Sequence, residues 1–204
     1  MSAGTHHGGP EAGGEPEAGG EPEAGGERPA AAARTGYVQV YTGDGKGKTT
    51  AGFGLAMRAA GRGLRVLILQ FMKADPTWGE IVSAGRLGIP VEQVGLDHWV
   101  RVGKLSPDDL RAAAAGFARA RDLVVSGAYD LVVLDELVTA LYFELVPVAD
   151  VLALLAAKPA HTELLLTGRR APDEIVAAAD LVSEMRPVKH YFDAGVNARE
   201  GIEY

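Results

Sequence analysis

Short apolar runs recur along the chain and alternate with longer segments in which alanine and leucine mix with polar residues. The clearest run, LRVLILQFM at residues 64–72, is almost continuously apolar. A strand in a parallel sheet is covered on both faces, so its apolar residues stand at successive rather than alternate positions. Further strands are predicted at residues 37–41, 91–94, 129–136, 163–169 and 181–185.

The segments between these runs predict helices. Ser106 is followed by a proline and two aspartates, which supply a hydroxyl cap, a suitable first-turn residue and acids near the positive helix end. That helix should run to about Val125 and stop at Gly127. Further helices are predicted at residues 49–60, 148–157 and 173–179.

This alternation of strands and helices predicts an α/β fold with a doubly wound, mostly parallel sheet and right-handed crossovers. Ligands of such sheets bind at the carboxyl ends of the strands. Four polar residues of interest fall at that edge: Thr42, Asp135, Glu136 and Arg169.

The N-terminal segment has a different composition. Residues 8–27 cycle through Glu-Pro-Glu-Ala-Gly-Gly, which offers almost nothing to bury. Proline, glycine and repelling glutamates keep such a segment extended and solvated. We therefore expect a disordered acidic tail at residues 1–35 and one globular domain at residues 36–204.

Charge and composition exclude several classes of protein. The formal net charge is −7, of which −4 falls in residues 1–35, and this argues against nonspecific nucleic-acid binding. A local pocket around Lys46, Lys48, Arg58 and Arg169 could still gather an anion. The chain has no cysteine, so any metal must be held by oxygen or histidine. No apolar run is long enough to span a membrane and no signal-peptide layout is present, so we expect a cytoplasmic protein without membrane association.

A glycine-rich segment, TGDGKGKTT at residues 42–50, lies between a predicted strand and a predicted helix. In such a loop, backbone N–H groups and Lys48 cradle phosphates, and the hydroxyl of Thr49 is available to Mg²⁺. Thr42 stands where the strict pattern has glycine, and the alternative is a flexible loop with two exposed lysines. The context favours a P-loop nucleotide-binding domain of the RecA-like type. The residues expected to bind the nucleotide are Thr42, Gly43, Asp44, Gly45, Lys46, Gly47, Lys48, Thr49 and Thr50.

Two carboxylates, Asp135 and Glu136, follow an apolar run. A carboxylate at such a strand end meets Mg²⁺ directly or through water, although two acids that simply face solvent are the alternative. Arg169 ends another run and could bind phosphate or ribose, or form a surface ion pair. These parts are shared by ATPases, small-molecule kinases and other nucleotide transferases, so they leave the reaction open.

Several segments, in the same order along residues 36–204, resemble the phosphate-loop family of ATP:corrinoid adenosyltransferases. Thr42 in place of glycine is usual for that family. The closing segment is the most specific part, because general ATPases do not share it. The resemblance rests on residues 42–50, 58–61, 70–71, 79–80, 134–137, 167–169, 184–190 and 192–204.

The resemblance implies transfer of the 5′-deoxyadenosyl group of ATP to the cobalt(I) of cob(I)alamin or cob(I)yrinic acid a,c-diamide, with triphosphate leaving. Residues 44–50 would hold the triphosphate, with Lys48 stabilising its charge. Thr49 and Glu136 would ligate Mg²⁺, with Asp135 behind them, and Arg58 would position ATP. No side chain need attack, because cobalt is the nucleophile.

Partners also follow from the resemblance: ATP, a reduced corrinoid, a reductase that supplies cobalt(I), and a second copy of the chain in a homodimer with the corrin near the subunit boundary. Two rival functions are a P-loop ATPase or kinase that releases ADP, and a nucleotide-dependent carrier that binds corrinoid without alkylating it.

One segment departs from the family pattern. Many relatives carry a Gly-Phe-Thr-Trp-like stretch whose aromatics displace the lower axial base of the corrinoid. Residues 95–101 read GLDHWVR here, without phenylalanine. Trp99, and less clearly His98, are candidates for that role, the alternative being a loop tryptophan that covers the core and an exposed histidine. His190 is interpreted as a structural histidine.

Overall fold

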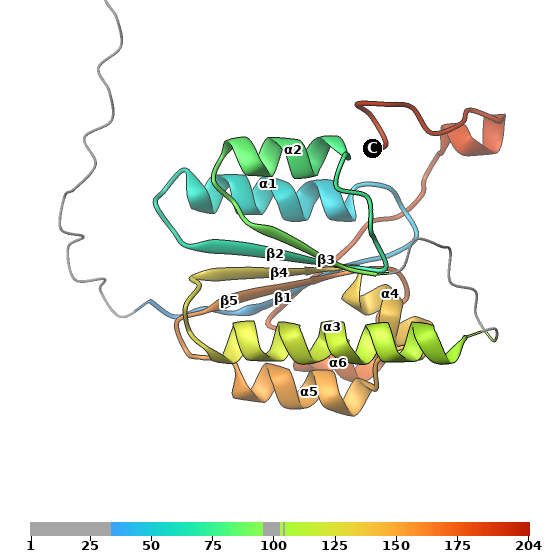
Figure 1. Cartoon of the computed structure of the whole chain (residues 1–204). Helices are drawn as coiled ribbons and strands as arrows, with labels where there is room; N and C mark the ends of the chain where they lie inside the picture. Colours follow the sequence, from blue (N-terminus) through green and yellow to red (C-terminus); the bar gives the residue numbers. More distant parts are fainter. Residues whose placement is uncertain (1–33, 96–102, 104) are drawn as a thin grey trace, which may run out of the picture. The chain divides into compact units, whose positions relative to one another are not determined.

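The computed structural model describes residues 34–95, 103 and 105–204. Its centre is a six-stranded sheet in which every pair of neighbouring strands is parallel. The strand order is β3-β2-β4-β5-β1-β6, which confirms the prediction of a doubly wound α/β fold (Figure 1). The strands are β1 Val38–Thr42, β2 Val66–Phe71, β3 Val91–Val94, β4 Leu131–Asp135, β5 Glu163–Thr167 and β6 Leu181–Glu184.

Helices cover both faces of the sheet (Figure 1). On one face lie α1 Lys48–Ala60 and α2 Gly79–Arg86, and on the other lie α3 Pro107–Val125, α4 Leu137–Tyr142, α5 Val148–Ala157 and α6 Asp173–Ala178. A 3₁₀ turn, η1 Tyr191–Ala194, follows near the C-terminal end. None of the helices in the described part of the chain has the length and apolar character needed to cross a membrane.

Two short helices were not predicted. Helix α2 begins and nearly ends with glycine and buries only Ala84, so its apolar pattern is weak. Helix α4 follows β4 after Asp135 and Glu136, has six residues and buries five of them, so it shows no amphipathic pattern.

The three central strands explain the continuous apolar runs. Every residue of β2, β4 and β5 is buried. Along β2, Leu67 and Leu69 belong to the core beneath α3, α4, α5 and α6, whereas Val66 and Ile68 belong to the core beneath α1 and α2. Successive side chains therefore enter two different cores, and both must be apolar.

The edge strand β6 is different, because all four of its residues are exposed. Among the described strands it pairs with β1 alone. Its role is therefore less to bury apolar surface than to extend the sheet beside the loop that follows β1.

The predicted start of α3 is confirmed in detail. The Ser106 hydroxyl accepts a hydrogen bond from the Asp109 N–H at 3.1 Å, and the Asp109 carboxylate accepts one from the Ser106 N–H at 2.7 Å. This reciprocal capping box satisfies two amides that the helix itself leaves without partners.

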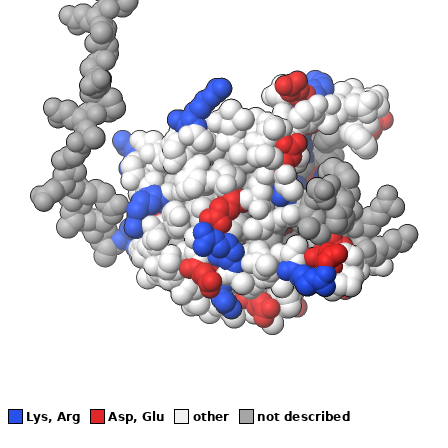
Figure 2. Space-filling view, viewed as in Figure 1, with Lys and Arg blue, Asp and Glu red and all other residues white. Residues whose placement is uncertain are grey.

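Surface charge is mixed on the face shown in Figure 2, where acidic and basic side chains are interspersed among neutral ones. Nonspecific binding of nucleic acid requires many cations facing the phosphate backbone. The described residues on this face do not provide such an array.

Helix α3 packs against β3 at Gly116. A Cβ atom added there would lie 2.8 Å from both Cβ and Cγ2 of Val94. We predict that Gly116→Ala lowers the free energy of unfolding by about 1–3 kcal/mol from overpacking, which exceeds the gain of up to ~1 kcal/mol in helix propensity. Urea unfolding measures the difference.

The matched control is Gly54→Ala in α1, where an added Cβ meets nothing within 4 Å. That variant should gain up to ~1 kcal/mol of stability. A Gly116→Ala protein that is as stable as Gly54→Ala would contradict close packing of α3 on β3.

Candidate active site

The phosphate loop connects β1 to α1 and lies against the end of β6. Gly43 and Gly47 have φ angles of 95° and 117°, which L-residues with side chains rarely adopt. The N–H of Gly45 donates to the carbonyl of Met185 at 2.7 Å. One amide of the predicted phosphate cradle is therefore already engaged, and the cradle must be formed by the remaining amides.

Lys48 is buried at the start of α1. Its ammonium donates to the carbonyls of Gly43 and Gly45, both at 2.7 Å. Burial lowers the pKa of Lys48, and the positive charge of Arg169 lowers it further. The lysine thus joins two carbonyls of the loop from inside.

The carboxylate of Asp135, at the end of β4, has no exposed surface. Its Oδ1 accepts hydrogen bonds from the hydroxyls of Thr167 at 2.6 Å and Thr49 at 3.0 Å. Its Oδ2 accepts from the amide of Gln70 at 3.0 Å and from the ammonium of Lys73 at 2.8 Å. This carboxylate therefore connects the phosphate loop to the ends of three neighbouring strands.

Glu136 follows directly and adopts a left-handed backbone conformation with a φ of 62°. Its N–H donates to the Thr167 hydroxyl at 3.0 Å, and its carboxylate accepts from the Thr139 hydroxyl. The Thr139 oxygen also accepts from the N–H of Arg169 at 2.9 Å. Thr139 thus links the Glu136 carboxylate to the backbone that follows β5.

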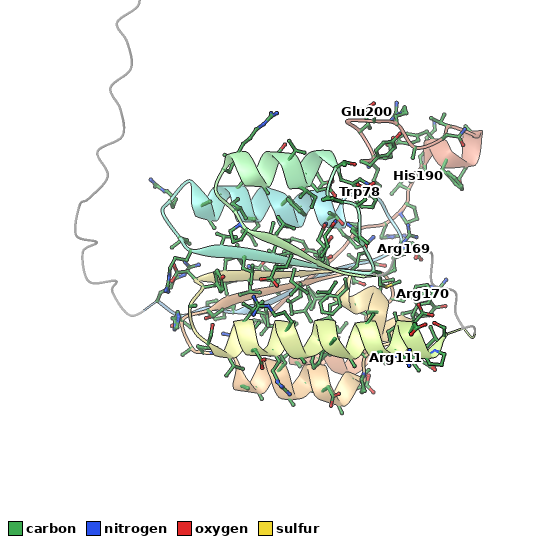
Figure 3. The ribbon with its side chains drawn as sticks, viewed as in Figure 1. Trp78, Arg111, Arg169, Arg170, His190 and Glu200 are labelled. Atoms are coloured by element: carbon green, nitrogen blue, oxygen red, sulfur yellow. The ribbon has the colours of Figure 1, made fainter. Side chains whose placement is uncertain are left out.

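These groups meet in a cavity of about 600 Å³. One wall is the phosphate loop with the start of α1, and another is the C-terminal segment, residues 190–204. Trp78, His190 and Arg169 lie at this end of the molecule in Figure 3. The lining residues are Gly45, Lys46, Gly47, Lys48, Thr49, Thr50, Phe53, Lys73, Trp78, Gly79, Glu80, Ser83, Glu136, Arg169, His190, Gly201, Ile202, Glu203 and Tyr204.

The C-terminal segment is attached to the phosphate loop through Lys46. The Lys46 ammonium donates to the carbonyl of Ile202 at 3.1 Å and lies 3.7 Å from the carboxylate of Glu203. Hydrogen bonds from the Tyr191 hydroxyl and then from Arg199 lower the pKa of Glu203 to about 2. Glu203 therefore carries its charge throughout the neutral and mildly acidic range.

The structure gathers most of the predicted site residues, but not Arg58. Arg58 lies in the last turn of α1, ten residues after Lys48, which corresponds to a rise of ~15 Å along the helix. It lines a separate cavity of about 760 Å³ between α1 and the end of β6. The predicted basic pocket is therefore formed by Lys46, Lys48 and Arg169 without Arg58.

The sequence left open whether Arg169 binds phosphate or ribose or forms a surface ion pair, and its position is compatible with both. Its guanidinium is about half exposed and lies 3.5 Å from the Asp44 carboxylate, so it forms a surface ion pair. It also lines the phosphate-loop cavity. A bound anion would compete with Asp44 for the same guanidinium.

His190 has the structural role that was expected. Its Nδ1 accepts a hydrogen bond from the Phe192 N–H at 3.1 Å and caps the 3₁₀ turn. Its ring also packs against Tyr191, with centroids 4.9 Å apart. The candidates for the lower corrinoid face, Trp99 and His98, lie outside the described residues, as does the tail through residue 33.

A metal site made only of protein side chains is not found among the described residues, which contain no group of three or more histidine or acidic side chains able to hold an ion. The oxygens of Thr49, Asp135 and Glu136 are nevertheless the hard ligands that Mg²⁺ prefers. Because Mg²⁺ usually keeps waters and takes phosphate oxygens as well, this donor set fits a metal that arrives with a nucleotide.

Three residues of the site were missed at the sequence level: Gln70, Lys73 and Trp78. Gln70 carried a usable signal, because it is a polar residue inside an otherwise apolar predicted strand. Lys73 and Trp78 follow that strand in a loop, and nothing in their spacing indicates that Lys73 reaches Asp135 or that Trp78 lies near Lys73. The contact of the C-terminal segment with Lys46 was likewise missed, because it joins residues 156 positions apart.

The position of Glu203 generates a prediction for the C-terminal segment. In Glu203→Gln, the attraction to Lys46 and Arg199 is lost, and trypsin should cleave at Lys189 and Arg199 severalfold faster than in the unchanged protein. The folded-state pKa lies below the ordinary 4.5, so the stabilisation is complete above pH 4.5 and disappears as the pH falls towards 2.

Glu200→Gln is the control, because it removes the same charge from an exposed position of the same segment. Limited proteolysis of both variants at neutral pH measures the effect. Equal cleavage rates in the two variants would show that Glu203 does not hold the segment.

Comparison with known proteins agrees with this geometry. Residues 34–204 match the family model described as ATP:corrinoid adenosyltransferase BtuR/CobO/CobP. The chain is 39% identical over 175 residues to the corrinoid adenosyltransferase CobA of Salmonella typhimurium, covering 85% of this chain and 88% of that protein. It is 38% identical to the corrinoid adenosyltransferase of Escherichia coli strain K12, covering 83% and 86%. A corrinoid adenosyltransferase of Pseudomonas aeruginosa is 36% identical, with coverage of 83% and 84%.

Proposed function

Because the chain belongs to the ATP:corrinoid adenosyltransferase family, we propose that it transfers the 5′-deoxyadenosyl group of ATP to the cobalt of a reduced corrinoid. The observation that carries this proposal is the phosphate loop, whose Thr49 donates to the buried Asp135 and whose Lys48 and Thr49 line a cavity large enough for a nucleotide. The alternatives of an ATPase, a kinase or a corrinoid carrier are not favoured by the family.

In the proposed reaction, the electron pair of cobalt(I) forms a bond to C5′ of the ribose. The bond between C5′ and the triphosphate oxygen breaks, and the triphosphate leaves with that electron pair. Catalysis then consists of orienting C5′ towards cobalt and stabilising charge on the leaving group. The protein needs no nucleophilic side chain of its own.

The loop supplies the stabilisation of the leaving group. The ammonium of Lys48 exchanges its two carbonyl partners for triphosphate oxygens, and the first-turn amides of α1 add their partial positive charge. Lys46 and Arg169 add further positive charge at the cavity wall. We assign Arg58 no contact with the triphosphate, because it lines the other cavity.

For the metal, we propose that Thr49 and Glu136 are the protein ligands of Mg²⁺ and that Asp135 orients the Thr49 hydroxyl. The Thr49–Asp135 hydrogen bond of 3.0 Å supports this assignment, because it leaves the hydroxyl oxygen as a lone-pair donor. Bound Mg²⁺ would offset negative charge on the triphosphate.

Further parts of the proposal rest on the family alone. They are a homodimer, a separate reductase that delivers cobalt(I), a cytoplasmic location, and cob(I)alamin or cob(I)yrinic acid a,c-diamide as the corrinoid. Trp99 remains the proposed residue for the lower face of the corrinoid.

The deciding experiment mixes the protein with Mg²⁺, ATP and chemically reduced corrinoid in the absence of oxygen. We expect one triphosphate for each cobalt–carbon bond, which is followed by the corrinoid absorption spectrum. Release of orthophosphate and ADP without corrinoid would instead identify an ATPase or kinase. Corrinoid binding without alkylation in a single turnover would identify a carrier.

Lys48→Ala removes the buried ammonium. Loss of one positioned charge typically costs a factor of about 10²–10³, and we expect a decrease of that size in kcat/KM for ATP. Arg121→Ala is the control, since it removes one positive charge from the exposed surface of α3. An unchanged kcat/KM in Lys48→Ala would contradict the role of the loop.

The same variant tests the pKa of Lys48. Because that pKa is lowered from 10.5, the free enzyme should lose the ammonium, and with it kcat/KM, at a pH below 10.5. This alkaline decrease should be absent from the residual activity of Lys48→Ala.

A further inference from the structure

Lys73, in the loop after β2, occupies the position between the two groups proposed to organise the metal. Its side chain is only 12% exposed. Its ammonium lies 2.8 Å from Oδ2 of Asp135 and 3.3 Å from the hydroxyl oxygen of Thr49. A cation is therefore built into this site by the protein itself.

The Thr49 oxygen accepts a hydrogen bond from Lys73, and the same lone pair cannot bind a metal at the same time. The hydroxyl hydrogen of Thr49 is directed to Asp135, so the lone pairs of the oxygen face the Lys73 ammonium. A metal ligated by Thr49 requires one of those lone pairs. The two positive charges would also lie close enough to repel each other.

The burial of Asp135 explains why a cation lies at this position. The carboxylate is fully buried, and its other side-chain donors, Thr49, Thr167 and Gln70, are neutral. A buried carboxylate without a positive partner is strongly destabilising. Lys73 supplies the positive charge.

A second partner for Lys73 is already in contact range. Its ammonium lies 5.4 Å from the centroid of the Trp78 ring, and both side chains line the cavity. Displacement from Thr49 therefore moves the ammonium within the cavity and not into bulk solvent.

We infer that Lys73 is a built-in counter-cation of Asp135, which Mg²⁺ arriving with the nucleotide displaces from Thr49. Lys73 thus sets how much Mg²⁺ the site requires, and it keeps the site folded when nucleotide is absent. This inference rests on the proposed nucleotide function of the same loop. It concerns binding and not the transfer step, so it is tested without corrinoid.

The test compares Lys73→Met with Lys46→Met. Lys46 also lines the cavity, but it contacts Ile202 and Glu203 and its side chain is 39% exposed. Both variants lose one positive charge from the cavity. The comparison therefore separates competition between Lys73 and Mg²⁺ at Thr49 from the effect of the total positive charge of the cavity. ATP binding is measured by equilibrium titration at increasing Mg²⁺.

We expect the Mg²⁺ concentration for half-maximal ATP binding to fall about tenfold in Lys73→Met, a typical coupling between two ligands of one site. In Lys46→Met the change should not exceed about threefold, as for an exposed charge. Without nucleotide, Lys73→Met should melt at a lower temperature than Lys46→Met, and Mg²⁺ alone should recover part of the difference.

A Mg²⁺ requirement that is unchanged or increased in Lys73→Met overturns the inference and makes Lys73 a phosphate ligand or a structural residue. If Lys73→Met does not fold, Lys73→Gln, which keeps a hydrogen-bond donor without the charge, is measured in its place with the same criteria. If the unchanged protein binds no ATP with Mg²⁺, the proposed function itself fails. ATP binding without later adenosyl transfer refutes that function while leaving the result for Lys73 valid.

Discussion

The buried carboxylate of Asp135 receives hydrogen bonds from Thr167 of β5, Gln70 of β2 and Thr49 of α1, and an ion pair from Lys73. These groups lie on elements that are distant in sequence, and an ionised carboxylate without them would be costly to bury. The requirement to satisfy this one side chain therefore fixes the start of α1 relative to the central strands. The phosphate loop leads into α1, so its position also depends on Asp135.

The second organising feature is that the loop is held from opposite sides. Lys48 binds two of its carbonyls from within, and the carbonyl of Met185 binds the Gly45 N–H from the sheet edge. Lys46 joins it to the C-terminal segment. A preformed loop loses little conformational freedom when it binds phosphate, which favours both affinity and orientation.

The sequence was sufficient for the elements whose signals are local. Strand β3 and helix α5 have the predicted bounds, and the cap at Ser106 is confirmed, because each depends on a few neighbouring residues. The strand-end position of Asp135 and Glu136 also followed from a local run of apolar residues. Helix α4 was missed because it has six residues, five of them buried, and so lacks the amphipathic pattern that indicates a helix.

The site could be predicted only in part, for a related reason. The loop residues and Asp135 belong to contiguous motifs, whereas Lys73, Trp78 and Glu203 reach the cavity through the folding of distant segments. Arg58 shares α1 with Lys48 and yet lines another cavity, so its role in positioning ATP stays a prediction. Residues of one helix can lie far apart along its axis and so belong to different cavities.

The hydrogen bond between Gly45 and Met185 has a consequence for how the molecule loses order. Met185 follows β6, an exposed edge strand whose only neighbour among the described strands is β1. Strands of this kind open in small fluctuations that leave the interior intact. The shape of the phosphate loop therefore depends on an edge strand that unfolds locally. Heating or denaturant should weaken nucleotide binding before the central strands unfold.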